Sequence, residues 1–226
     1  MKTVFWAAAV VALPLLAQSA SAQEQPADTS GHFSFGVTGG TLGVGPEIGY
    51  RVNNTVGVRA NATFLSFSHT VKSNDVRYDG TAKLQSGGAT IDIYPFGGGF
   101  RFSAGARANG NSGRLRATPM SNTRIGGIDF TPAQIGTITG DAETKGFAPQ
   151  LTLGYGGKLR RGLSLSIEAG ALFQGAVQIR DYRADGALSN NALFIAQLEK
   201  ERLHVQDTLD KYKVYPIVQI GLKYRL

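Results

Sequence analysis

The sequence predicts an all-β fold, a closed antiparallel transmembrane β-barrel of eight strands, with an amphipathic helix in the last extracellular loop. Three observations favour it. An apolar stretch at the N-terminus is typical of export, apolar residues recur at every second position in several later stretches, and 30 of the 226 residues are glycine. A barrel in lipid places apolar residues outside and polar or small residues inside. Such alternation is consistent with a mean hydropathy of −0.09.

Residues 1–22 are predicted to be a cleavable signal peptide. Lys2 supplies a positive charge, residues 4–17 form an apolar core, and Ala20-Ser21-Ala22 is a small-residue cleavage site. The apolar core contains Pro14 and is short for a helix that crosses about 30 Å of hydrocarbon. An uncleaved N-terminal anchor is the alternative. After cleavage, residues 23–226 would form a single domain, exported through the inner membrane to the bacterial outer membrane.

The composition excludes several classes of function. The chain has no cysteine, so disulfides and thiolate sites are excluded. Its 23 Lys and Arg residues exceed its 16 Asp and Glu residues. These cations are scattered over strand ends and loops without a basic stripe, so we expect no nucleic-acid partner. We expect these cations to interact instead with outer-membrane lipids and lipopolysaccharide, which is anionic.

The end of the chain shows the clearest strand, because apolar residues occupy every second position from Val214 to Leu226. A tilted strand of about ten residues matches the thickness of a membrane. The last residues resemble the terminal signal read by the barrel assembly machinery, with Leu226 where that signal usually has Phe. The residues that carry this resemblance are Val218, Ile220, Leu222, Tyr224 and Leu226.

Further strands follow from the same period of two. Five are predicted over residues 42–52, 55–64, 100–109, 151–159 and 163–179. A seventh, over 81–96, changes its apolar phase between Leu84 and Ala89, which predicts a β-bulge at Gly87-Gly88. An eighth, short strand over 33–37 is predicted to turn at Gly39-Gly40, because single-chain bacterial barrels have even strand numbers.

Short and long connections alternate along the chain. The short ones are Asn53-Asn54, Gly97-Gly98-Gly99 and Arg160-Arg161-Gly162, and the long ones are residues 72–80, 118–145 and 183–213. Barrels of this kind have short periplasmic turns and long external loops. We therefore expect the short connections and the C-terminus on the periplasmic side, and loops 118–145 and 183–213 as candidate surfaces for a partner.

The last long loop contains apolar residues at helical spacing, which predicts an amphipathic helix over residues 188–212 with Asn190 or Asn191 as N-cap. These residues are Leu188, Ala192, Ile195, Leu198, Val205, Leu209 and Tyr212. Four placements are compatible with the pattern: packing on its own loops, a lid across the barrel mouth, the surface of the outer leaflet, or a partner.

Charged residues are predicted to point into the barrel interior at similar depth. They are Glu47, Arg59, Asp92, Arg107 and Glu168. The interior of an eight-stranded barrel is just wide enough for side chains, and buried ions must pair to offset desolvation. We expect a packed plug of salt bridges; a gated ion path or a proton-linked switch is the alternative.

No catalytic residue, metal site or cofactor is predicted. Ser68-His69 with Asp75 and Asp79 offers the residue types of a hydrolase, but adjacent residues of a strand point to opposite faces. His32 has no acidic or hydroxyl neighbour at useful spacing, and His204 lies on the predicted helix. No two histidines have the spacing of a metal site.

Two motifs carry a family resemblance. They are residues 94–101, Tyr-Pro-Phe-Gly-Gly-Gly-Phe-Arg, and the ending formed by residues 213–218 and 224–226. The chain resembles a group of proteobacterial outer-membrane barrels without an assigned activity, and its architecture resembles the small barrels typified by outer membrane protein A, OmpX and OmpW. The resemblance implies a fold and a location and carries no catalytic residue.

We therefore expect a non-enzymatic, integral outer-membrane protein. Its role would be in envelope integrity or in contacts with a host or another protein through its external loops. A narrow channel or conduit for hydrophobic solutes is the first alternative, and a lipid A-modifying enzyme is the second.

Overall fold

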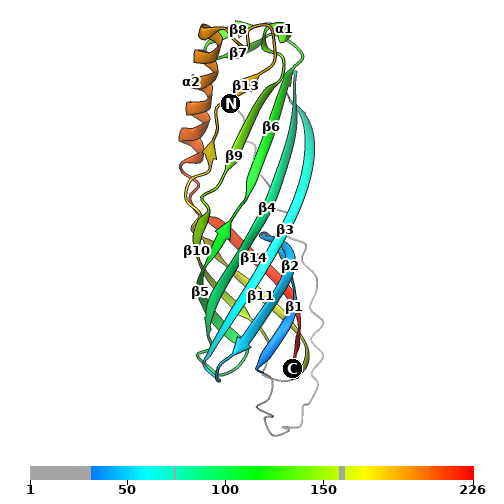
Figure 1. Cartoon of the computed structure of the whole chain (residues 1–226), viewed down its shortest axis with the longest axis vertical. Coiled ribbons are helices and arrows are strands. Elements are labelled where there is room, and N and C mark those ends of the chain that lie inside the picture. Colours follow the sequence, from blue (N-terminus) through cyan, green and yellow to red (C-terminus); the bar gives the residue numbers. More distant parts are fainter. Residues whose placement is uncertain (1–31, 74, 158–160) are drawn as a thin grey trace.

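Eight antiparallel strands form a ring in the computed structural model, which describes residues 32–73, 75–157 and 161–226 (Figure 1). The strands are β1 (Phe33–Gly40), β2 (Gly43–Arg51), β3 (Val56–Ser73), β4 (Val76–Ile93), β5 (Phe100–Asn109), β10 (Phe147–Tyr155), β11 (Gly162–Leu172) and β14 (Tyr215–Arg225). Each pairs with the next, and β14 pairs with β1, so the ring returns to its start. The predicted signal peptide lies outside the described residues.

The eighth strand predicted near the start of the chain is present as β1. Its register with β14 runs from Ser34↔Arg225 to Gly40↔Gln219. The hairpin to β2 turns at Thr41 and Leu42, two residues later than the predicted turn at Gly39-Gly40. Leu42 was expected on the outer face, but it is 4% exposed and lies inside, because the turn carries it over the end of the ring.

The outer face of the ring is apolar, and the inner face is polar or glycine except for an apolar layer at one end. Each strand contributes exposed apolar side chains at alternate positions. We call this surface the apolar belt; it includes Phe35, Val37, Ile48, Val58, Phe64, Ile91, Phe102, Phe147, Leu151, Leu153, Leu165, Ile167, Val218, Ile220, Leu222, Tyr224 and Leu226. The turns at Asn53-Asn54 and Gly97-Gly98-Gly99, the end of β10, the start of β11 and the C-terminus lie together at one end of the ring, which we call the short-turn end.

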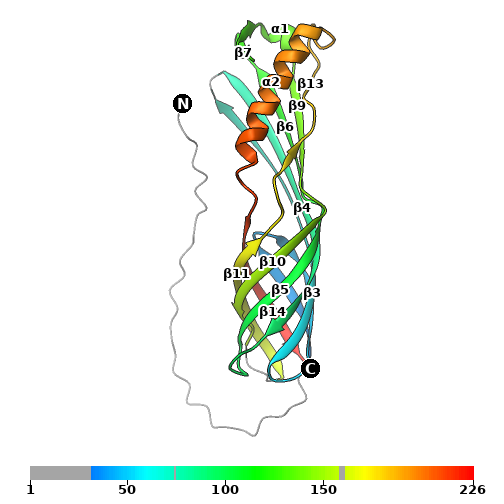
Figure 2. The same cartoon turned by 90° about the vertical axis from the view of Figure 1, so that its left-hand side faces the viewer.

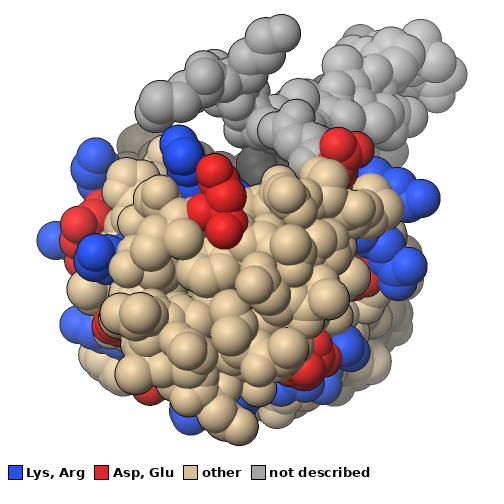
Figure 3. All heavy atoms as spheres, turned by 90° about the horizontal axis from the view of Figure 1, so that it is seen from above, with Lys and Arg blue, Asp and Glu red and all other residues tan. Residues whose placement is uncertain are grey.

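At the opposite end, β3 and β4 continue beyond the ring into an open part of the same sheet. We call this open part and its cap the extension (Figure 2). Its other strands are β6 (Ser112–Pro119), β9 (Ile138–Glu143), β12 (Gln178–Ile179) and β13 (Arg183–Ala184), and its cap contains β7 (Thr123–Ile125), β8 (Ile128–Phe130), α1 (Pro132–Ile135) and α2 (Ala192–Leu209). Seen from above, Lys and Arg side chains lie around the periphery, and mostly uncharged residues cover the centre (Figure 3).

The segments predicted as long loops are thus largely ordered into strands and helices. Most of the described residues within 72–80 belong to strands, since β3 and β4 pair up to Ser73↔Val76. Strand β11 ends at Leu172, well before the predicted end at residue 179, and Gln178 and Ile179 pair with β9 instead. Strand β10 spans residues 147–155 rather than the predicted 151–159.

The bulge predicted at Gly87-Gly88 is wrong. The β3–β4 register is continuous from Val56↔Ile93 to Ser73↔Val76. Thr63 and Ser86 pair on the inner face of the ring, and the next pair on that face, Leu65↔Leu84, is apolar. The apolar phase therefore changes because the two faces of the sheet exchange polarity where the sheet leaves the ring.

Helix α2 begins after Asn191, whose side-chain Oδ1 accepts hydrogen bonds from the backbone N–H groups of Leu193 and Phe194. It packs against the other elements of the cap, where Phe194 and Leu198 form a buried cluster with Ile125, Phe130 and Ile135. Ile195, predicted on the apolar face, is 49% exposed, and Leu193 and Leu203 are also exposed. Among the described residues, no helix has the length and apolar character needed to cross a bilayer.

Glycines on the inner face let neighbouring strands approach closely. A Cβ atom on Gly105 of β5 would lie 2.0 Å from the carbonyl oxygen of Ala89 on β4, so no side chain fits there. Gly87, on the outer face of β4, is different, because its Cβ would meet only the carbonyl oxygen of Asn61, at 3.8 Å. The close β4–β5 contact therefore depends on glycine at position 105 and tolerates alanine at position 87.

We predict that Gly105→Ala lowers the free energy of unfolding by about 1–3 kcal/mol, because the added methyl group must push two strands apart. Urea titration of the refolded protein in detergent micelles measures this quantity. Gly87→Ala is the matched control and should unfold like the wild type. Equal stability of the two variants would contradict the steric argument.

Candidate functional site

The ring interior contains a buried cluster of ions centred on Arg59 of β3. The guanidinium contacts three carboxylates from three strands: Nη1 lies 3.0 Å from Glu47 Oε2, Nε lies 3.1 Å from Asp92 Oδ2, and Nη2 lies 2.6 Å from Glu168 Oε2. Its side chain is 6% exposed. The alternation of β2, β3, β4 and β11 brings these four side chains, all predicted to point inside, into direct contact.

Two further cations complete the cluster, and neither was predicted from the sequence. Arg101 Nη2 lies 2.7 Å from Glu168 Oε2, and Lys223 Nζ lies 2.5 Å from Glu47 Oε1. With Arg59, they supply three positive charges against the three carboxylates. Both have the inward phase of their strands, and that phase, together with their closeness to the short-turn end, is the signal that could have identified them.

Arg107, the fifth predicted residue, lies apart from the carboxylates. It donates hydrogen bonds to Asn61 Oδ1 at 2.7 Å, to Thr63 Oγ1 at 3.1 Å and to Ser86 Oγ at 3.0 Å. Asn61 in turn donates to Glu47 Oε2 at 3.4 Å, which links Arg107 to the ion cluster through one amide. Arg107 therefore belongs to a layer of neutral polar groups on the extension side of the cluster.

Both ends of the interior are also filled. At the short-turn end, the Arg51 guanidinium lies 3.2 Å from the centre of the Tyr94 ring and donates hydrogen bonds to the backbone carbonyls of Asn53, Asn54, Gly97 and Gly98. At the extension end, an apolar layer closes the ring. It consists of Leu42, Ala148, Leu172 and Ile217, with Tyr215 packed against them.

The exposed fractions show how completely this interior is packed. Arg101 and Arg107 are 1% exposed, Asp92 is 2% exposed and Glu47 is 3% exposed. In a water-filled channel, the charged groups that line it would be exposed to water. Here they are almost fully buried by other side chains, so the arrangement suits a structural plug better than a path for ions.

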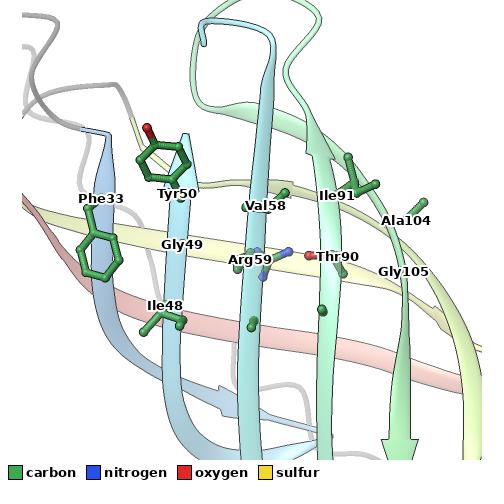
Figure 4. A pocket seen from close by; sticks show the side chains of 12 residues that line it. Phe33, Ile48, Gly49, Tyr50, Val58, Arg59, Thr90, Ile91, Ala104 and Gly105 are labelled. Carbon is green, nitrogen blue, oxygen red and sulfur yellow. The ribbon is translucent and has the colours of Figure 1, made fainter. Parts of the chain in front are cut away.

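A hollow with a volume of about 500 Å³ lies outside the ring, on the apolar belt. Its floor is formed where small side chains follow one another across β3, β4 and β5, at Ala60, Ala89 and Ala104. Figure 4 shows Phe33 and Tyr50 on one side and Ile91 on the other, while Arg59 belongs to the inner side of β3. The hollow is therefore a dent in an apolar surface, separate from the ion cluster.

The hydrolase constellation considered in the sequence does not assemble. Ser68 Oγ lies 3.0 Å from Thr81 Oγ1, and His69, next to Ser68 on β3, points to the opposite face. Asp79 accepts hydrogen bonds from Thr70 and Arg77 instead. His32 Nδ1 contacts the carbonyl oxygen of Arg51, and His204 is exposed on α2. Within residues 32–73, 75–157 and 161–226, no three potential metal ligands gather.

No protein-family model matches the chain, and no curated protein matches it. Solved structures do. CarO2 of Acinetobacter baumannii has a TM-score of 0.58 and 19% identity, covering 86% of this chain and 98% of CarO2. CarO of Acinetobacter baumannii has a TM-score of 0.55 and 21% identity, covering 85% and 97%. A major outer membrane protein from Thermus thermophilus has a TM-score of 0.42 and 12% identity, covering 86% and 99%. The eight-stranded ring is thus similar to outer-membrane barrels.

We predict that Arg59→Met lowers the free energy of unfolding by about 3–5 kcal/mol, because it leaves three buried carboxylates without their shared cation. Urea titration in micelles measures the change. Arg124→Met is the control: Arg124 pairs with Asp129 on the surface, where both side chains are more than half exposed, so its removal should change stability by less than about 1 kcal/mol. A wild-type midpoint for Arg59→Met would contradict the central role of this cluster.

Proposed function

We propose that this chain is an integral protein of the bacterial outer membrane, a closed transmembrane β-barrel with a blocked interior and no enzymatic activity. Its role would be structural, in envelope integrity, or in surface contacts made by the extension. The observation that carries this proposal is the charge-balanced, nearly solvent-free ion cluster across the ring interior. A protein that fills its lumen in this way presents its chemistry on the outside.

The apolar belt supports the membrane location. Strand β5, with 10 residues, spans about 25 Å at about 3.4 Å per residue and a tilt of about 40°, and the apolar band of outer-membrane barrels has about this height. Short turns face the periplasm in such barrels, which would place the extension outside the cell. The signal peptide predicted over residues 1–22 and the assembly signal predicted at the C-terminus belong to the same proposal.

The extension supports a role in surface contacts. It contains most of the two segments proposed as partner surfaces, residues 118–145 and 183–213, ordered as strands and helices rather than as loose loops. Preformed surfaces bind with less loss of conformational entropy than loops that order on binding. Neither a channel nor an enzyme has comparable support in the described residues.

We predict that the purified protein forms no discrete conductance steps in planar bilayers, and that Glu168→Gln does not create them, because the remaining side chains still fill the ring. Insertion is checked separately by protease protection of the barrel in vesicles. Reproducible single-channel currents from the inserted wild type would refute the blocked interior and favour the narrow-channel alternative.

We also predict that lipid A keeps the same mass spectrum when the gene is deleted, since Ser68 and His69, the candidate nucleophile and base, do not come together. Complementation by the wild-type gene is the control. Loss of one acyl chain or headgroup modification upon deletion, restored by complementation, would establish the enzymatic alternative.

A further inference from the structure

The outer side of the extension differs from the apolar belt below it. On β3, the belt residue Phe64 is followed on the same face by Ser66, Ser68, Thr70 and Lys72, and none of these four is apolar. Residues paired across neighbouring strands share this face, so β4, β6 and β9 add further polar side chains to it. A polar, outward-facing wall therefore rises directly from the edge of the belt.

This wall is hollowed into a groove rich in arginine. Two adjoining hollows, of about 430 Å³ and 350 Å³, share Arg114 and Arg183. We call them together the arginine groove. Its charged lining consists of Lys83, Arg114, Arg116, Arg180 and Arg183 against Asp141, Glu143 and Asp185. Cations outnumber carboxylates, so the groove has a positive excess.

The carboxylates orient the arginines without covering them. Asp141 lies 2.6 Å from Arg114 Nε and 2.6 Å from Arg183 Nη2, while the two arginine side chains stay 62% and 70% exposed. The hydrogen bond from Arg114 holds the pKa of Asp141 below its usual value, so this carboxylate stays charged. Each guanidinium has five N–H donors, so most of them remain available to an external acceptor.

Two cations of the groove, Lys83 and Arg116, have no acidic partner within ion-pair distance among the described residues. They lie at different heights. Lys83 is opposite Ser66, two positions beyond the belt residue Phe64, and Arg116 is opposite Asp79 on β4. From Lys83 to Asp79, β4 rises about 13 Å at about 3.3 Å per residue. The groove thus covers the first layer above the belt.

We propose that the arginine groove binds the phosphate groups of a phosphorylated glycolipid headgroup in the leaflet that surrounds the barrel. Arginine recognises phosphate through paired N–H donors, and cations next to an apolar belt meet the headgroups of the same lipids whose chains cover that belt. The proposal rests on the membrane location proposed above. An acidic protein is the competing partner. The groove lies on the outward-facing side of the extension, starting two positions beyond the belt residue Phe64, which favours a lipid headgroup. Lys and Arg side chains as a class lie mainly at the periphery in the view from above (Figure 3).

The test is a binding titration of the folded protein in zwitterionic micelles, followed by native mass spectrometry. The probes are bisphosphorylated lipid A, the same lipid A without phosphates, inorganic phosphate and a polyglutamate peptide. We expect bisphosphorylated lipid A to bind at least about tenfold more tightly than each of the others. Lys83→Gln with Arg116→Gln should weaken its binding by about tenfold or more, because two cations are lost near the phosphates.

The double variant leaves no carboxylate unpaired, so it should fold. The matched control, Arg124→Gln with Lys211→Gln, removes two exposed charges of the extension outside the groove and should bind lipid A like the wild type. If both double variants lost binding equally, net charge alone would explain the effect and the proposal would be overturned. Tighter binding of polyglutamate or of free phosphate than of lipid A would also overturn it.

Insertion of the protein into phosphatidylcholine vesicles is measured in parallel. If the protein inserts but its lipid A binding does not depend on the groove, the groove proposal alone is refuted. If it binds lipid A but does not insert, the proposed membrane location is refuted.

Discussion

The pairing of β1 with β14 is the contact on which the rest of the structure depends. It joins the two ends of the ring, so the backbone groups of residues 34–40 that face β14 find partners. An unpaired backbone group in an apolar environment costs several kcal/mol. The pairing also requires small residues, because a Cβ on Gly36 or Gly40 would lie about 2 Å from a carbonyl oxygen of β14. That close approach narrows the ring until Lys223 of β14 can reach Glu47 of β2 across β1, and the ion cluster follows from it.

Beyond the ring, the polarity of the two faces of β3 and β4 is exchanged, and here the sequence-based prediction was wrong. A shift of apolar phase at Leu84 has two physical explanations: an inserted residue, or a change in what each face contacts. The continuous β3–β4 register excludes the first. The face that holds Thr63 and Ser86 inside the ring holds Leu65 and Leu84 beyond it, so polarity records the surroundings while the register stays constant.

Prediction succeeded where one face of a strand is apolar and the other polar over many residues, as in β14 and β5, because the alternation there is strict. It failed for β6 and β9, whose two faces are both partly exposed and whose pattern is therefore weak. Within the ring, the alternation of apolar and polar residues identified which side chains point inward, but it did not identify which of them contact one another. Arg101 and Arg107 share a phase on β5, yet they lie about 20 Å apart along it, and only Arg101 reaches a carboxylate. Strand tilt decides such contacts, and a period of two carries no information about tilt.

The protein contains two clusters of charged residues, the ion cluster inside the ring and the arginine groove of the extension. They differ in how far their side chains are exposed, and this difference suggests different roles. Inside the ring, one cation holds three carboxylates, with side chains less than a tenth exposed, where breaking a pair is costly. In the extension, Asp141 holds Arg114 and Arg183, whose side chains are mostly exposed. Surface pairs of this kind contribute about 0–1 kcal/mol, so stability does not explain why five cations line one groove. An arginine that is oriented but still exposed suits the recognition of an external anion, and this contrast with the buried cluster is the reason that we propose binding at the outer wall rather than in the lumen.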